Sequence, residues 1–206
     1  IKKFIELNKI KKTIFLTPDL SYKNEVEQAI SRSKIKLIKR YTYDTSPTKL
    51  TQQIEKITNY KRRKQNLEDE IKRLEKSDKD NKEKLIETLK KKDTLGKEKF
   101  DSLIIADFDE SLKSVTTSLL YTDISPKEKY YITLNQWFDE SLLKEKSSQP
   151  IYFPSINKKN YENFSSEYFE KFNHYPNQLS FLSFDLVGLV YYLILQNASI
   201  VDKKIF

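Results

Sequence analysis

Apolar residues along the chain gather in short runs separated by amphipathic stretches, and this alternation predicts strands joined by helices. The runs 13–17 and 100–106 are apolar along most of their length, as expected for strands buried on both faces. The segments 35–43 and 129–134 predict two more strands, and a short apolar piece lies at 150–153. Strands separated by helices favour a parallel sheet. The expected fold class is therefore α/β, with a parallel sheet flanked by helices.

Apolar residues also recur at helical spacing between the predicted strands. Val26, Ala29 and Ile30 indicate a helix after the first strand, and Ser21 is placed to cap it. Asp109 is placed to cap a second helix, which follows the apolar run that ends at residue 106.

The stretch 61–92 is the most highly charged part of the chain. A helix predicted to start near Thr48 carries its apolar stripe into this stretch, where polar residues interrupt it. Apolar positions then resume, and Gly96 stands where a helix would end. Asp78 and Asn81 would fall in the core of a continuous coiled coil. The pattern therefore predicts a helical hairpin inserted between two strands.

The C-terminal part of the chain has a different pattern. Aromatic positions between Tyr161 and Phe172 predict a helix that ends before Pro176. Residues 179–195 predict a helix that is apolar on nearly all sides, which must be covered by a missing lobe or another chain. We interpret the uncharged run 186–201 as a buried helix, since it is short for a membrane span. A homo-oligomer, paired or swapped through this helix, is therefore expected.

Composition excludes several kinds of chemistry. The chain of 206 residues has no Cys, one His and two Gly, which excludes disulfides, thiol catalysis, multi-His metal sites and glycine-rich phosphate loops. No metal or cofactor is expected. The formal net charge of +8 favours anionic partners, although a lysine-rich coding background would explain the same excess. The chain has no Met, so we interpret it as a piece of a longer protein, with any signal peptide or lipid-anchor Cys upstream.

Three motifs occur in an order known from one superfamily. They are TIFLTPDLSYK at 13–23, FDSLIIAD at 100–107 and YENFSSEYFEKFNHYP at 161–176. Their order resembles the type I periplasmic-binding fold of branched-chain amino-acid-binding proteins, although Lys23 replaces a Gly of its pattern. The resemblance implies the second lobe of that fold, a periplasmic location and no catalysis. The implied domains are the end of a first-lobe helix at 1–12, the α/β lobe with its hairpin insertion at 13–137, and a hinge with a helical return segment at 138–206.

One subgroup of that superfamily is more similar. The segments that carry this similarity are 93–96 (DTLG), 100–112 (FDSLIIADFDESL) and 134–137 (LNQW), followed by Asp139. They resemble the alphaproteobacterial penicillin-binding-protein activators, which are lipoprotein-activator-like proteins. The resemblance implies a regulator of peptidoglycan synthesis whose partner is a cell-wall synthase. The alternative is a solute-binding subunit of an ABC importer or sensor, with an amino-acid-like ligand.

Candidate ligand-binding residues follow the predicted strands, because ligands of open parallel sheets bind beyond the carboxyl ends of the strands. These residues are Asp19, Tyr22, Asp107, Phe108 and Trp137. Asp107 is expected to pair with a ligand ammonium, and Tyr22 and Trp137 to stack on the ligand or cover it. The alternative is that the aspartates cap turns and helices and that Trp137 fills a hinge.

The basic run Lys61, Arg62, Arg63 and Lys64 is the candidate partner-binding surface. It would grip phosphate or form part of a docking arm for a protein. Over residues 61–92, 13 Lys/Arg interleave with 8 Asp/Glu, so a solvated, ion-paired helix face is the alternative. No groove-reading motif is present, and nucleic acid is not an expected partner. Membrane contact is expected only through an upstream anchor.

Overall fold

The computed structural model describes residues 1–78, 80–134, 142, 144–155 and 157–197, and the chain divides into two compact units. Unit 1 is Ile1–Pro154 and unit 2 is Ser155–Phe206. A last strand at 151–152 belongs to the sheet of unit 1, and the domain limits that the motifs implied stay predictions.

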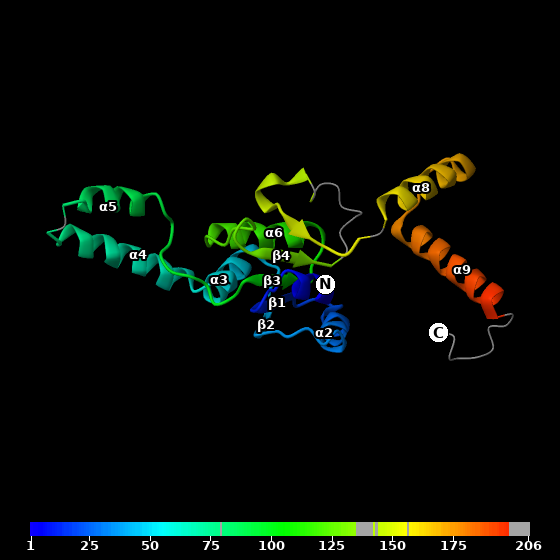
Figure 1. Cartoon of the computed structure of the whole chain (residues 1–206), viewed down its shortest axis with the longest axis horizontal. Helices are drawn as coiled ribbons and strands as arrows, with labels where there is room; N and C mark the ends of the chain where they lie inside the picture. Colours follow the sequence, from blue (N-terminus) through cyan, green and yellow to red (C-terminus); the bar gives the residue numbers. More distant parts are fainter. Residues whose placement is uncertain (79, 135–141, 143, 156, 198–206) are drawn as a thin grey trace. The chain divides into compact units, whose positions relative to one another are not determined.

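A parallel five-stranded sheet forms the centre of unit 1 (Figure 1). Every paired register in it is parallel, which confirms the predicted α/β class. The central strands β1 and β3 are buried along their whole length, as their apolar runs predicted. The strand order is β2-β1-β3-β4-β5, with bounds β1 Thr13–Pro18, β2 Lys39–Tyr43, β3 Ser102–Ile105, β4 Tyr130–Thr133 and β5 Ile151–Tyr152.

Helices cover both faces of the sheet, and alternate strand residues point to each. Ile14 and Leu103 lie on the face that packs against α3 and α6, while Phe15 and Ile104 lie on the face that packs against α1 and α2. Residues 1–12 thus contribute a helix to the covering of this sheet. The helices of unit 1 are α1 Lys2–Leu7, α2 Lys23–Arg32, α3 Pro47–Ile57, α4 Tyr60–Glu75, α5 Lys82–Lys90, α6 Asp109–Tyr121 and the short 3-10 helix η1 Lys146–Ser148.

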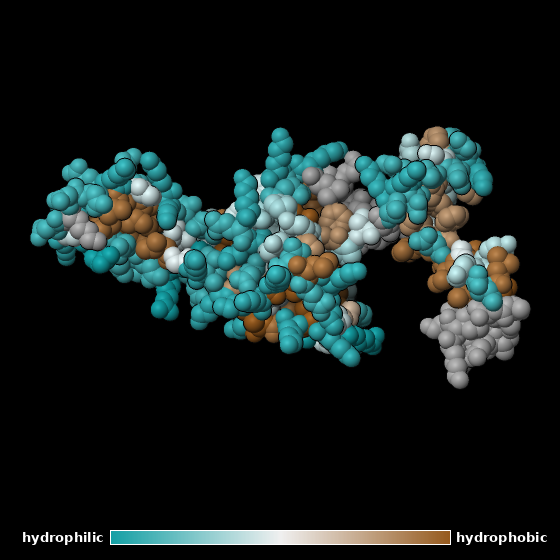
Figure 2. Space-filling model, in the orientation of Figure 1, coloured by the Kyte–Doolittle hydropathy of each residue, from teal (hydrophilic) through white to brown (hydrophobic). Residues whose placement is uncertain are grey.

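Helices α4 and α5 form the predicted hairpin between β2 and β3 (Figure 1). Leu67 and Leu74 are buried between them, and Figure 2 shows an apolar seam there with hydrophilic side chains around it. The single helix predicted from Thr48 into the hairpin is instead two helices. Asn59 adopts a left-handed conformation with φ 52°, which ends α3 and turns the chain into α4.

Three local predictions differ from the structure. Ser21 does not cap α2, which begins at Lys23 after Tyr22, and Asp109 is the first residue of α6 rather than its side-chain cap. The second strand begins at residue 39 and not at residue 35. Ile35 and Leu37, which precede it, pack as partly buried loop residues against the face covered by α1 and α2.

The described residues of unit 2 form α8 (Lys158–Phe172) and α9 (Gln178–Asn197). They meet through aromatic rings, with Phe164 and Phe181 buried and their centroids 5.3 Å apart. In this structure α8 covers only one side of α9 and Val187 is 68% exposed, so the expected covering of α9 by a missing lobe or another chain stays a prediction. By length and composition alone, residues 179–196 of α9 meet the requirement for a membrane span.

Candidate functional site

Asp107 lies at the carboxyl end of β3 and is buried, with 1% of its surface exposed. Its Oδ2 accepts hydrogen bonds from the Tyr43 hydroxyl at 2.5 Å and the Ser111 hydroxyl at 2.6 Å. Its Oδ1 accepts from the Tyr22 hydroxyl at 3.1 Å and the Phe108 amide at 2.8 Å. One carboxylate therefore joins the end of β2 to the segments that follow β1 and β3, and these three strands are neighbours in the sheet.

Both tyrosines are held as neutral hydrogen-bond donors. Burial raises the pKa of Tyr43, and the negative charge of Asp107 and the hydrogen bond to it raise it further. The pKa of Tyr22 is raised by the same causes in the same order. A phenolate at either position would face a carboxylate in a poorly solvated place, so both hydroxyls keep donating at neutral pH.

Two aromatic rings lie at this edge of the sheet. The rings of Tyr22 and Phe108 are both partly buried and meet edge to face, with centroids 6.0 Å apart. Asp19 lies on the same edge but is exposed, and its Oδ1 forms an ion pair with Lys23 Nζ at 3.1 Å. Its backbone amide donates to the carbonyl of Tyr43, which fixes the turn after β1 beside β2.

The structure thus brings together three of the predicted ligand-binding residues, Tyr22, Asp107 and Phe108. Trp137 lies outside the described residues. Tyr43 belongs to the cluster but was not predicted, although it ends β2 and the carboxyl-end rule would have included it. Because at least four donors of the chain already bind Asp107, its carboxylate positions the aromatic rings around it.

Arg63, predicted as a partner-binding residue, is buried at the base of the hairpin with 4% of its surface exposed. Its Nε donates to the Thr58 carbonyl at 3.1 Å, and its Nη2 donates to the Thr122 carbonyl. Its Nη1 donates to Thr94 Oγ1 at 2.8 Å and to Glu98 Oε1 at 2.7 Å. The guanidinium is enclosed by these acceptors, which corrects the prediction that it faces a partner.

The acceptors of Arg63 are themselves part of a wider network. Lys129 Nζ lies 2.9 Å from the second oxygen of Glu98, and the Thr94 hydroxyl donates to Asp123 at 2.5 Å. The network therefore fastens the hairpin to the segment before β3, the end of α6 and the start of β4. The backbone of the hairpin is closed at the same place, because the Leu95 amide donates to the Arg63 carbonyl at 3.0 Å.

The other three residues of the basic run, Lys61, Arg62 and Lys64, are exposed on α4. Lys61 lies 3.7 Å from Glu55, a loose ion pair at the surface. Only these three of the four predicted side chains are placed to contact a partner.

Comparisons with known proteins give one distant similarity. No protein-family model matches the chain, and no curated protein shows significant sequence similarity to it. Among solved structures, it is similar to a solute-binding protein of an ABC transporter from Rhodopseudomonas palustris BisB5 in complex with 3,4-dihydroxybenzoic acid, with a TM-score of 0.44 and 11% identity. The match covers 93% of this chain and 45% of that one. A similarity at this level assigns neither a family nor a ligand, and the class established by the structure is that of an α/β domain with a parallel sheet.

Proposed function

We propose that unit 1 is a non-catalytic binding lobe that holds a small polar solute at the carboxyl edge of its sheet. The observation that carries this proposal is the buried Asp107, which fixes Tyr22 and Phe108 side by side at that edge. Carboxyl edges of parallel sheets are where such folds bind ligands, and rings held in place lose little entropy on binding. The protein would serve as the periplasmic solute-binding subunit of an ABC importer or sensor.

The surroundings of the two rings favour a solute with a positively charged group and an apolar part. Asp19, Asp109 and Glu110 are exposed at this edge, where Asp19 pairs with Lys23 and Glu110 with Lys113. Three acids against two lysines leave a net negative charge that would attract a cation placed over Tyr22 and Phe108. An amino-acid-like solute has this combination.

The test is thermal unfolding of the full-length protein with a panel of amino acids and small amines. A true solute raises Tm, because binding at a hundredfold excess over Kd adds about 2.7 kcal/mol to the free energy of unfolding. Tyr22→Ala should abolish the shift, while Tyr175→Ala, a change of an exposed tyrosine in unit 2, should leave it intact. Absence of a shift with every solute would contradict the proposal.

The hairpin supports a second candidate function, regulation of peptidoglycan synthesis. We propose that α4 and α5 form a docking arm for an acidic surface of a cell-wall synthase. The specific observation is the network around Arg63, which holds the hairpin firmly at its base while Lys61, Arg62 and Lys64 stay exposed. An upstream lipid anchor, as in the activator family, would keep the arm near its partner.

Pull-down of a peptidoglycan synthase by the full-length protein tests this second function. Reversing the charges of Lys61, Arg62 and Lys64 to Glu should lower the bound fraction, with a loss that grows smaller at high salt. The matched control reverses three exposed lysines of the N-terminal segment, Lys2, Lys3 and Lys11. Equal loss in both variants, or no capture by the wild-type protein, would reject the docking arm.

A further inference from the structure

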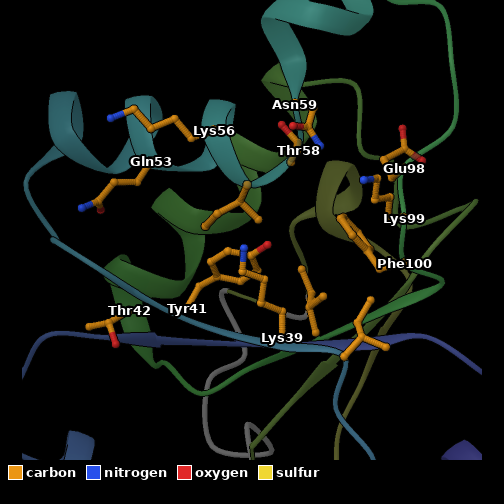
Figure 3. Close-up of a pocket in the computed structure, with 13 residues that line it drawn as sticks. Lys39, Tyr41, Thr42, Gln53, Lys56, Thr58, Asn59, Glu98, Lys99 and Phe100 are labelled. Atoms are coloured by element: carbon orange, nitrogen blue, oxygen red, sulfur yellow. The ribbon is translucent and has the colours of Figure 1, made fainter.

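Unit 1 has a groove of about 630 Å³ between the edge strand β2 and the C-terminal half of α3 (Figure 3). Its lining includes Ile14 and Lys39, which lie near the amino ends of β1 and β2, and Phe100, which precedes β3. The groove therefore runs along β2 from Lys39 at its amino end to Thr42 near its carboxyl end, and Asp107 is not among its lining residues. Its volume is that of a small-molecule site.

The inner part of the groove is apolar. Phe100 and Ile14 are buried there, with 4% and 1% of their surfaces exposed. Tyr41 and Ile57, both partly buried, line it from β2 and α3. A ring or a short hydrocarbon would find apolar contact on several sides.

The groove is positively charged at its opening. Lys39, Lys56 and Lys99 line it, and among the described residues none of the three forms an ion pair with a carboxylate. Lys39 Nζ lies 5.0 Å from the centroid of the Tyr41 ring. The one acid among the lining residues, Glu98, is already paired with Arg63 at 2.7 Å and with Lys129 at 2.9 Å.

Neutral donors accompany these ammonium groups. In Figure 3, Lys39 rises beside the ring of Tyr41, Lys99 extends toward Asn59 and Thr58, and the Asn59 side chain points down from the α3–α4 junction. The backbone of Asn59 is left-handed, with φ 52°. Two ammonium groups and an amide above an apolar floor form a set of donors that fits an anion with an apolar body.

We propose that this groove binds a small organic anion, a carboxylate or phosphate attached to a ring or a short apolar chain. The anionic group lies between Lys39 and Lys99 beneath Asn59, and the apolar part packs against Phe100 and Tyr41. This site is separate from the carboxyl edge of the sheet and takes a ligand of opposite charge. Its existence does not depend on solute binding at Tyr22 and Phe108.

Calorimetric titration of the protein with phenyl phosphate and with benzoate tests the proposal and separates phosphate from carboxylate recognition. At least one of the two should bind saturably, and inorganic phosphate, which lacks an apolar part, should bind more weakly than phenyl phosphate. The double variant K39Q/K99Q should lower the affinity about tenfold or more, because two charge-assisted contacts are lost. Asn59→Gly should lower it about fivefold while keeping the left-handed backbone, so that folding is preserved.

The matched control is K11Q/K127Q, which removes two exposed lysines of unit 1 outside the groove. The control should bind like the wild-type protein. Equal losses of affinity in K11Q/K127Q and K39Q/K99Q would show that binding depends only on net charge, and this would overturn the proposed site. Absence of saturable binding of both anions up to about 10 mM, or equally tight binding of benzylamine, would overturn it as well.

Discussion

Arg63 and Asp107 are buried charged side chains that join distant parts of unit 1. Burying a charge costs several kcal/mol unless hydrogen bonds replace the lost water. Arg63 meets carbonyl and carboxylate oxygens from three other segments, and Asp107 meets hydroxyl and amide donors. Each charge is therefore stable only when the segments that surround it are in place, which ties local packing to the whole sheet.

Truncation of Arg63 should destabilise the protein strongly. Arg63→Ala leaves the carbonyls of Thr58 and Thr122 without their side-chain donor and Glu98 with Lys129 alone, so we expect a loss of about 3–5 kcal/mol in the free energy of unfolding. Urea denaturation followed by circular dichroism measures it. The neighbouring Arg62→Ala, at an exposed position, should change this energy by less than about 0.5 kcal/mol. Similar effects of the two substitutions would show that the network contributes little.

Alkaline pH should weaken the cluster around Asp107. The pKa of Tyr43 is raised in the folded state above the ordinary value of about 10. The unfolded chain therefore loses this proton first, so the stabilisation is fully present below about pH 10 and is lost as the pH rises above it. Urea midpoints measured from neutral to alkaline pH should fall, and Tyr43→Phe should make the fall shallower. An unchanged pH profile in Tyr43→Phe would contradict this.

At the scale of elements, the hairpin of α4 and α5 is tied to the rest of unit 1 at its base. Leu67 and Leu74 hold α4 and α5 together, while Arg63 fastens the base. A segment of this kind can unfold locally at a lower free energy than the whole domain needs to unfold.

Leu74→Ser should therefore unfold the outer hairpin and leave the sheet intact. Hydrogen exchange should accelerate in α4 and α5, with β1 and β3 still protected. Lys72→Ser, on the exposed side of α4, serves as the control and should keep the hairpin protected. Loss of protection in β1 as well would show that hairpin and sheet unfold as one.

Helices and strands could be predicted where the local pattern of apolar and polar residues was sufficient to identify them. The strands at 13–17 and 100–106 were found because long apolar runs leave little alternative, and the hairpin because polar residues interrupt its stripe. The helix break at Asn59 was missed, since a single left-handed residue does not alter the spacing of apolar residues around it. Glu98 was missed because its partner Arg63 is 35 residues away along the chain. Tyr43 is 64 residues from its partner Asp107, yet its place at the end of β2 was a signal that could have found it.

At the scale of the whole molecule, α9 is the feature that a single chain leaves unexplained. Its side chains Leu186, Val187 and Leu195 are 60%, 68% and 64% exposed on one helix. Continuous apolar surface of this kind marks a place of association. We expect the chain to self-associate through α9 when nothing else covers it.

Light scattering measures this association directly. The wild-type chain should have a mean mass above the 24.6 kDa of one copy, and the double substitution Leu186→Ser with Val187→Ser should bring it down to that value. Leu7→Ser, which removes a leucine that is 72% exposed on α1, should leave the mass unchanged. A monomeric wild-type chain would contradict association through α9.

The closed base of the hairpin has a consequence for how this domain can be altered. The Leu95 amide donates to the Arg63 carbonyl, so the chain enters and leaves the hairpin at neighbouring points. The residues between Arg63 and Leu95 therefore form a loop with fixed, adjacent ends. Closing a longer loop between fixed ends costs only about 0.6 kcal/mol for each doubling of its length. The tip of the hairpin should therefore tolerate insertions. Natural variants can differ in length there, and an engineered reporter can be inserted without redesigning the sheet.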